Sequence, residues 1–144
     1  LTSAQMAALT VYGEARNQPV MGLVAVLAVL RNRIADGRWG SSWMSVCLAR
    51  KQFSCWNDGD PNQSILLSLA DVLVAHQPIL KNPVFDVCAY LAERATGGDL
   101  GDPTGRATHY LTRHLYETKT VAWTFPPAKL TMMVADHVFF TGVR

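Results

Sequence analysis

The sequence has few charged residues, few cysteines and no long apolar run, and each shortage excludes a class of protein. Charged residues make up 17% of the chain against 49% hydrophobic residues, which excludes a disordered segment and a charge-rich coiled coil. The formal net charge is only +2 and Lys and Arg form no cluster, so we predict no nucleic-acid partner. The cysteines form neither a disulfide framework nor a metal-ligand spacing. We expect buried free thiols, while a bridge between Cys47 and Cys55 stays open.

The longest apolar run, Val20–Leu30, has about eleven residues and is followed by Arg31 and Arg33. A bilayer span needs about 20 apolar residues, so we predict no stable membrane insertion. The N-terminus shows no basic segment, apolar segment and small-residue cleavage site in succession, and hence no visible signal peptide. The chain also has no repeat, low-complexity tract or linker. We therefore expect one domain over residues 1–144, acting as a monomer.

Two helices near the N-terminus are predicted from their caps and their apolar spacing. The first begins after Thr2, which has Gln5 as its capping-box partner, and it runs through Glu14. The second covers Val20–Asp36 and is stopped by a glycine. Because it has no polar face for three turns, we predict that it is the buried central helix of the core. Ser42–Ala49 is expected to add one or two helical turns.

The rest of the chain predicts two further helices and then short strands. Asn62 or Ser64 is expected to cap a helix that reaches to about His76, and a second helix is expected over Pro83–Ala95. Their expected inward side chains are Ile65, Leu66, Leu69, Val72 and Leu73 in the first, and Val84, Val87, Cys88 and Leu91 in the second. Ala107–Leu111 has the pattern of a short strand, and Leu130–Val134 and His137–Phe140 can pair as a closing hairpin. The predicted fold class is mainly α (α+β), with a few short C-terminal strands.

Glu14 is the first candidate for chemistry, because it lies inside the apolar arc of the first helix and in its expected last turn. Burial and the negative end of the helix dipole both favour the protonated form of a carboxyl there. A catalytic acid near neutral pH requires that combination. An ion pair with Arg16, Arg31 or Arg33 is the equally simple alternative.

A second group of candidates lies in segments that are predicted as loops or short strands. Flat aromatic faces together with amides and hydroxyls are typical of a groove that binds sugars. The alternative is that these aromatic residues only close small clusters over the core. The group consists of Gln52, Ser54, Trp56, Thr108, His109, Tyr110 and Trp123.

Other kinds of site have weaker support in the sequence. Ser54 lacks the surroundings of a nucleophilic serine, and no spacing favours a thiol dyad of Cys55 with His109. The Asx-rich turn at 57–62 lacks the spacing and the terminal Glu of a calcium loop. His109 and His137 have no further ligands at metal spacing. We therefore predict no metal and no cofactor.

The ordered motifs of the chain resemble those of the SleB-type cell-wall hydrolases, a family that includes spore-cortex lytic enzymes and phage endolysins. The segment Ala8–Arg16, with the sequence ALTVYGEAR, is similar to the opening motif of that family. The similar blocks that follow in order are Val29–Arg33, Gln52–Trp56, Asp102–Tyr110 and His137–Phe140. The resemblance covers nearly the whole chain, and it is the ordered set of blocks, more than any one of them, that is specific.

This resemblance implies a lysozyme-like domain that cleaves the glycan strands of peptidoglycan. It identifies Glu14 with the catalytic glutamate of the family. The residues that it places along the groove are Gln52, Phe53, Ser54, Thr108, His109 and Tyr110. Two departures stand out. The family commonly has a second His where this chain has Leu111, and the Trp123 region matches only loosely.

No motif supplies a second carboxylate, and ordinary glycosidases use two. This favours a lytic transglycosylase that cleaves the β-1,4 bond between N-acetylmuramic acid and N-acetylglucosamine and forms a 1,6-anhydro end. A muramidase that uses water, with help from an aspartate in the turns at 58–60 or 99–102, is the nearest alternative. A non-catalytic glycan-binding module is the alternative from another class. We expect a phage endolysin that acts on the cell wall, in the periplasm or outside the cell.

Overall fold

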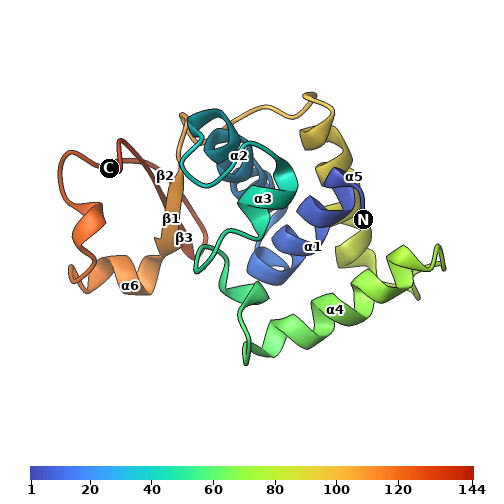
Figure 1. The fold of residues 1–144 in the computed structure, drawn as a ribbon. Helices are drawn as coiled ribbons and strands as arrows, with labels where there is room; N and C mark the ends of the chain where they lie inside the picture. The colour runs from blue at the N-terminus through green and yellow to red at the C-terminus, as the bar shows by residue number, and fades with distance from the viewer.

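The computed structural model describes all 144 residues, and Figure 1 shows helices α1–α5 on one side of the molecule and a small sheet on the other. This arrangement confirms the predicted mainly α (α+β) fold. None of the helices combines the length and the apolar character that crossing a membrane would need. The elements are α1 (Ser3–Ala15), α2 (Val20–Asp36), α3 (Trp43–Cys47), η1 (Ser54–Trp56), α4 (Pro61–Val74), α5 (Pro83–Thr96), β1 (His109–Thr112), α6 (Arg113–Glu117), η2 (Ala122–Thr124), β2 (Lys129–Val134) and β3 (His137–Thr141).

Helix α1 begins at the predicted capping box and lies at the centre of the helical side. The Thr2 hydroxyl accepts from the Gln5 N–H at 3.0 Å, and the Gln5 side chain accepts from the Thr2 N–H at 2.8 Å. α1 then contacts α2, α3, α4, α5 and η1. The helix is therefore surrounded by protein on most sides.

Helix α2 has the predicted bounds and ends at Gly37, whose left-handed backbone lets its N–H donate to the Arg33 carbonyl at 3.0 Å. Every residue of Ala25–Leu30 is buried, as expected for a core helix. The first turn differs, because Val20 and Met21 are exposed. The enclosure that the apolar run predicts therefore begins only at the second turn.

Helix α4 buries less than its sequence predicts. It begins earlier than expected, at Pro61, because Asp60, and neither Asn62 nor Ser64, caps it by accepting from the Asn62 N–H at 2.8 Å. Only Leu66 is fully buried, and the predicted inward residue Ile65 is exposed. The reason is geometric: α4 packs mainly on α1 and η1, so one narrow row of its side chains reaches the core.

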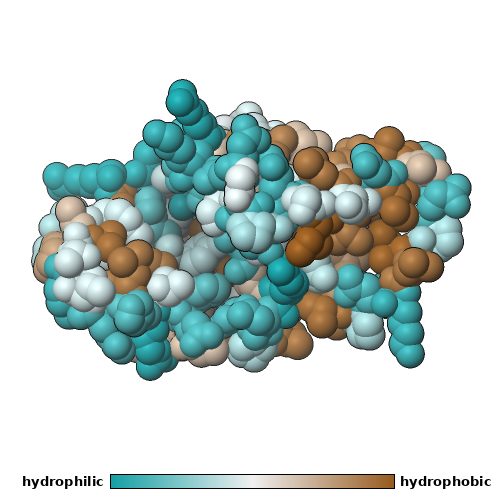
Figure 2. All heavy atoms as spheres, turned by 90° about the horizontal axis from the view of Figure 1, so that it is seen from below, coloured by the Kyte–Doolittle hydropathy of each residue, from teal (hydrophilic) through white to brown (hydrophobic).

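Helix α5 buries Cys88 and Leu91 as predicted, but its core-facing side is rotated away from the other two predicted residues. Val84 and Val87 are exposed, and the buried residues are Phe85, Cys88, Leu91, Ala92 and Ala95. The bulk of Phe85 decides the rotation, because its ring packs edge-on against Tyr12 at 5.6 Å. The apolar side chains left outside contribute to the hydrophobic surface over α4 and α5 on the right of Figure 2.

The three strands form one antiparallel sheet in the order β1–β3–β2, and the predicted closing hairpin of β2 and β3 is confirmed. One face carries Tyr110 and Phe139 and packs on the helices. The other face carries Leu111, Val138 and Phe140. Together with Ala128 and Val143 they form a second, smaller core. The sheet with α6 and η2, here called the sheet lobe, therefore stands as a wall beside the helices.

Candidate active site

Glu14 lies in the last turn of α1, as predicted, and Gly13 beside it allows η1 to approach closely. A Cβ atom on Gly13 would lie 2.8 Å from Cys55 Cβ and 2.8 Å from Leu66 Cδ1. Only glycine permits that contact between α1, η1 and α4. As a result, the backbone of Ser54 and Cys55 lies beside the Glu14 carboxyl.

The Glu14 carboxyl is half-buried, and burial is the main cause that raises its pKa to about 7. The negative charge of Asp60 raises the pKa further. Hydrogen bonding by the Cys55 thiol and by the backbone of Cys55 and Ser54 acts in the opposite direction, with a smaller effect. Near neutral pH the carboxyl is therefore divided between its acid and base forms.

No arginine pairs with Glu14, since the two ion pairs of the protein are Arg38–Asp36 and Arg94–Asp99. Arg16 instead stacks on Tyr12 at 5.2 Å and donates to its carbonyl at 3.4 Å. The ion-pair alternative is therefore wrong. The carboxyl opens into a hollow of about 260 Å³, which is lined by Gly13, Glu14, Arg16, Asn17 and Asn62.

Arg33 is the second buried charge near the site, and it joins three segments. Its Nε donates to the Thr108 carbonyl at 2.7 Å, and its guanidinium donates to Gln52 Oε1 at 3.0 Å. The guanidinium also lies 4.4 Å from the Trp39 ring and 5.1 Å from the Phe53 ring. Burial lowers its pKa to about 10, so Arg33 stays charged at neutral pH. It holds the end of α2, the chain before η1 and the start of β1 together.

The predicted residues before and within η1 have different environments. The Gln52 amide is held by Arg33. Phe53 is buried in the core, and the Trp56 indole donates to the Thr10 hydroxyl at 3.0 Å. Ser54 is exposed and its hydroxyl makes no hydrogen bond within the protein. Of these residues, Gln52 and Ser54 present polar atoms, while Phe53 and Trp56 line a hollow of about 470 Å³ with Lys51 and Asp58.

The predicted residues of β1 lie at the edge of the sheet that faces α2. His109 is placed between the rings of Trp39, at 5.3 Å, and Trp123, at 5.0 Å. Burial and the nearby Arg33 charge lower the pKa of His109 to about 4, so its ring is neutral. Thr108 is buried, and its hydroxyl lies 2.9 Å from His109 Nδ1.

Tyr110 points toward the helices from the other face of the strand. Its ring lies 5.0 Å from His137 and 5.5 Å from Phe139. Burial raises the pKa of Tyr110, and the charge of Glu14 raises it further. The hydroxyl is therefore protonated, and Tyr110 and Glu14 belong to one electrostatic neighbourhood.

Three of the predicted residues meet in one further hollow of about 540 Å³, here called the basic pocket. It is lined by Arg38, Trp39, Lys51, Gln52, His109, Trp123 and Arg144. Lys51 also lines the hollow beside Phe53 and Trp56, so the two are neighbours. Figure 2 shows a recess between the sheet lobe, on the left, and the helices. Thr108 faces a different hollow, behind the basic pocket.

The site also contains three residues that were not predicted from the sequence: Arg33, Trp39 and Lys51. Arg33 follows Val26, Val29 and Leu30 at helical spacing, so it continues the buried row of α2. That position is a usable signal, because an arginine on a core-facing row needs a buried partner. Nothing in the local sequence marks Trp39 or Lys51.

The remaining aspartates do structural work, as the turn chemistry predicts. Asp60 caps α4, and Asp58 accepts from the Gln63 amide at 2.9 Å. Asp99 pairs with Arg94. The Asp102 carboxylate accepts from the Thr104 hydroxyl and from the side-chain amide of Asn32 in α2. Among them, only Asp60 acts on the charge of Glu14.

No thiol dyad forms, because the Cys55 thiol is buried and donates toward the Thr10 carbonyl at 4.0 Å. Burial raises the pKa of all three thiols, which keeps them protonated. All three are free, so the bridge that the sequence left open does not form.

Residues 17–140 match the family model described as cell wall hydrolase. The chain belongs to the cell wall hydrolase family. This membership confirms the resemblance to the SleB-type enzymes. The match begins three residues after Glu14, so the position of that residue in the site rests on the geometry described above.

Named relatives and solved structures agree with this family. Two spore cortex-lytic enzymes of Bacillus cereus are 28% identical over 135 residues, which cover 94% of this chain and 42% of each relative. The chain therefore spans less than half the length of those relatives. The catalytic domain of the germination-specific lytic transglycosylase SleB from Bacillus anthracis is 25% identical, with a TM-score of 0.64 over 96% of this chain and 93% of that one. The Bacillus cereus SleB catalytic domain, 24% identical, has a TM-score of 0.65 over 96% and 89%.

The fit around Gly13 predicts the effect of adding one methyl group. Gly13→Ala forces apart side chains that now lie 2.8 Å from the new atom, so we expect a loss of about 1–3 kcal/mol in the free energy of unfolding. Urea unfolding measures it. Gly101→Ala is the matched control, since nothing lies within 4 Å of its new atom, and we expect a change within about 0.5 kcal/mol. Equal stabilities of the two variants would contradict the close contact.

Proposed function

We propose that this chain cleaves the glycan strands of bacterial peptidoglycan, at the β-1,4 bond between N-acetylmuramic acid and N-acetylglucosamine. The observation that carries the proposal is the Glu14 carboxyl, which has a pKa of about 7, no ion-pair partner and an open hollow beside it. Family membership and the names of the relatives support the substrate. A module that only binds glycan gains nothing from such a carboxyl, which disfavours the non-catalytic alternative.

In the proposed mechanism Glu14 acts first as an acid and then as a base. Its proton passes to the glycosidic oxygen as the bond to C1 of the muramic residue breaks. The carboxylate then takes the proton of the C6 hydroxyl of the same sugar, whose oxygen bonds to C1 and closes a 1,6-anhydro ring. The proton gained equals the proton given, so Glu14 returns to its starting state. Ser54, whose backbone lies beside Glu14, and Tyr110, whose pKa is raised by the Glu14 charge, are the residues that we propose to orient the sugar through their hydroxyls.

A muramidase that uses water is the second candidate, and one observation favours it. Asp60 is the carboxylate whose charge acts on Glu14, so it is the natural partner in a two-carboxylate mechanism. Against this, Asp60 is engaged as the cap of α4. Asp99 and Asp102 are held in other contacts and do not contribute.

We also propose that the chain acts at the cell wall, in the periplasm or outside the cell, because its proposed substrate lies there. Its origin as a phage endolysin stays a prediction, since the named relatives come from Bacillus. The monomeric state stays a prediction as well.

Glu14→Gln should abolish nearly all cleavage while keeping the fold. The amide has almost the same shape but cannot give and recover the proton, which is worth about 10²–10⁴-fold in rate. Turbidity loss of purified peptidoglycan measures the rate, and Glu93→Gln, an exposed glutamate on α5, is the matched control. Cleavage by Glu14→Gln at the rate of the control would remove Glu14 from the mechanism.

Stability against pH supplies the folding control for the same variant. Because the pKa of Glu14 is raised on folding, the folded chain binds more protons than the unfolded chain between pH 4.5 and about 7. Relative to the Gln variant, the Glu14 protein therefore loses stability through that window as the pH rises, while the lowered pKa of His109 acts in the opposite direction in both proteins and cancels in the comparison. At pH 8 the melting temperature of Glu14→Gln should equal or exceed that of the unchanged protein.

The products separate the two enzymatic candidates. A transglycosylase leaves anhydro ends that are one water lighter than hydrolytic ends and that take up no label from heavy-oxygen water. Mass spectrometry of the released muropeptides distinguishes them, and we expect the anhydro form. Asp60→Asn keeps an equally good helix cap, so it should retain most of the activity. Labelled reducing ends, together with a loss of activity in Asp60→Asn, would instead establish the muramidase.

A further inference from the structure

The basic pocket has an unusual lining for a sugar site, since it combines three cationic side chains with three aromatic rings and one amide. No Asp or Glu side chain lines it. Its volume of about 540 Å³ lies within the usual range for ligand pockets. The lining comes from the loop after α2, the chain before η1, β1, η2 and residue 144, so only the folded chain assembles it.

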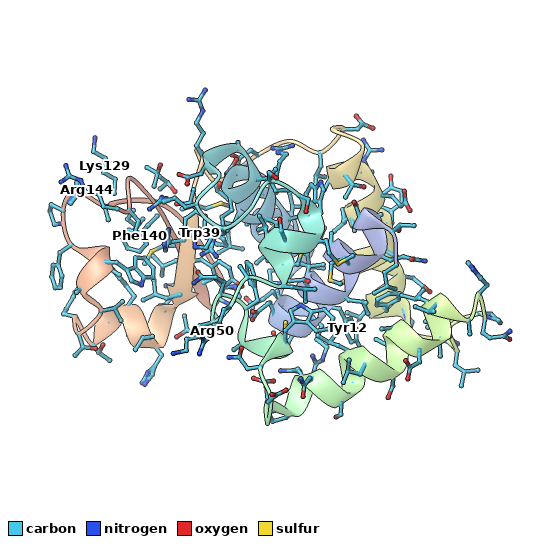
Figure 3. The ribbon with its side chains drawn as sticks, viewed as in Figure 1. Tyr12, Trp39, Arg50, Lys129, Phe140 and Arg144 are labelled. Atoms are coloured by element: carbon cyan, nitrogen blue, oxygen red, sulfur yellow. The ribbon has the colours of Figure 1, made fainter.

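The aromatic wall of the basic pocket is held in place. Trp123 packs edge-on against Phe140 at 5.5 Å, and His109 lies between Trp123 and Trp39. Trp39 in turn covers the buried Arg33 guanidinium, and Figure 3 shows it between α2 and the sheet lobe. Because the His109 ring is neutral, this wall adds stacking surface and no charge. A sugar ring or a planar amide fits such a surface.

The cations of the pocket are only partly balanced within the protein. Arg38 is paired with Asp36 through two contacts of 2.7 and 3.1 Å. Lys51 and Arg144 form no ion pair, and the buried Arg33 behind Gln52 has no carboxylate partner either. The charge of this region is therefore positive, and an anionic group of a ligand would balance it.

Lys51 lies in a turn and is one of five non-glycine residues of the chain with a positive φ angle. Its φ angle is 61°, in the left-handed region that a lysine rarely adopts. This conformation places Lys51 at the border of two hollows, the basic pocket and the one beside Phe53 and Trp56. Gln52 next to it uses its oxygen for Arg33, and its amide N–H₂ makes only a long contact of 3.4 Å to the Arg50 carbonyl. Lys51 and Gln52 thus both present donors to the pocket.

We propose that the basic pocket binds a carboxylate carried by a muramic residue next to the cleaved bond. This inference rests on the proposed function. Gln52 lines the pocket, and only Phe53 separates it from Ser54, whose backbone lies beside the Glu14 carboxyl, so the Cα atoms of Gln52 and Ser54 are at most about 7 Å apart and the pocket neighbours the catalytic site. Each muramic residue has a lactyl group that ends in a carboxylate or continues into a peptide with carboxylates of its own. N-acetylglucosamine has neither, so the pocket distinguishes peptidoglycan from a neutral polymer such as chitin.

The test measures binding to the Glu14→Gln protein by calorimetry, with defined muramic tetrasaccharides as probes. The first probe has free lactyl carboxylates, the second is the same compound converted to its methylamide, and the third bears stem tetrapeptides. A charge-assisted hydrogen bond is worth about 1.5 kcal/mol or more, so we expect the methylamide to bind about tenfold more weakly than the free acid if the lactyl group is read. If the pocket binds a carboxylate of the stem peptide, the tetrapeptide probe should bind about tenfold more tightly than the methylamide.

Variants at Lys51 complete the test. Lys51→Gln should remove most of the advantage of the charged probe, and Lys51→Arg should restore it. Lys119→Gln is the matched control, because Lys119 has a similar backbone φ of 57° but lies over the Tyr116 ring and does not line the basic pocket. Equal affinity of the unchanged pocket for charged and methylamidated probes, with no gain from the tetrapeptide, would overturn the inference while leaving cleavage intact. Failure of every muramic probe to bind would overturn the proposed function itself.

Discussion

The close contact between Gly13 in α1 and Cys55 in η1 is the constraint on which the site depends. It is possible only because Gly13 has no side chain, and it brings protein over the last turn of α1. Glu14 loses water on one side without gaining a cation, and the neighbouring charge of Asp60 adds to the effect. One small residue thus makes an ordinary glutamate an acid that still holds its proton near pH 7.

Arg33 plays the corresponding part between the two sides of the molecule. Its hydrogen bonds to Thr108 and Gln52 tie the sheet lobe and the chain before η1 to the end of α2. Because the guanidinium is stacked on Trp39 and Phe53, it costs less to bury than an isolated charge would. Arg33 therefore fixes the side chains at the bottom of the recess between the sheet lobe and the helices. The Gln52 amide N–H₂ remains available to donate to a ligand in that recess.

Local signals made the helices, the hairpin and the position of Glu14 predictable. The capping box at Thr2, the stop at Gly37 and the turn between β2 and β3 each depend on a few neighbouring residues. The rotation of α5 was not predictable, because it depends on how Phe85 meets Tyr12 across the core. The same holds for the charge of Asp60 beside Glu14 and for the basic pocket, whose lining comes from five separate segments. Residues whose roles depend on contacts between distant segments show no local pattern in the sequence.

The protonation of Glu14 is the central claim, and a direct titration tests it. The chain has three glutamates, Glu14, Glu93 and Glu117, so their side-chain carboxyl carbons can be followed separately by NMR after ¹³C labelling. Glu14→Gln identifies the signal of interest by its loss. We predict a midpoint near pH 7 for that signal, against values near 4.5 for ordinary glutamates. A midpoint near 4.5 for Glu14 would contradict the proposed role of the Gly13–Cys55 contact and of Glu14 as the acid.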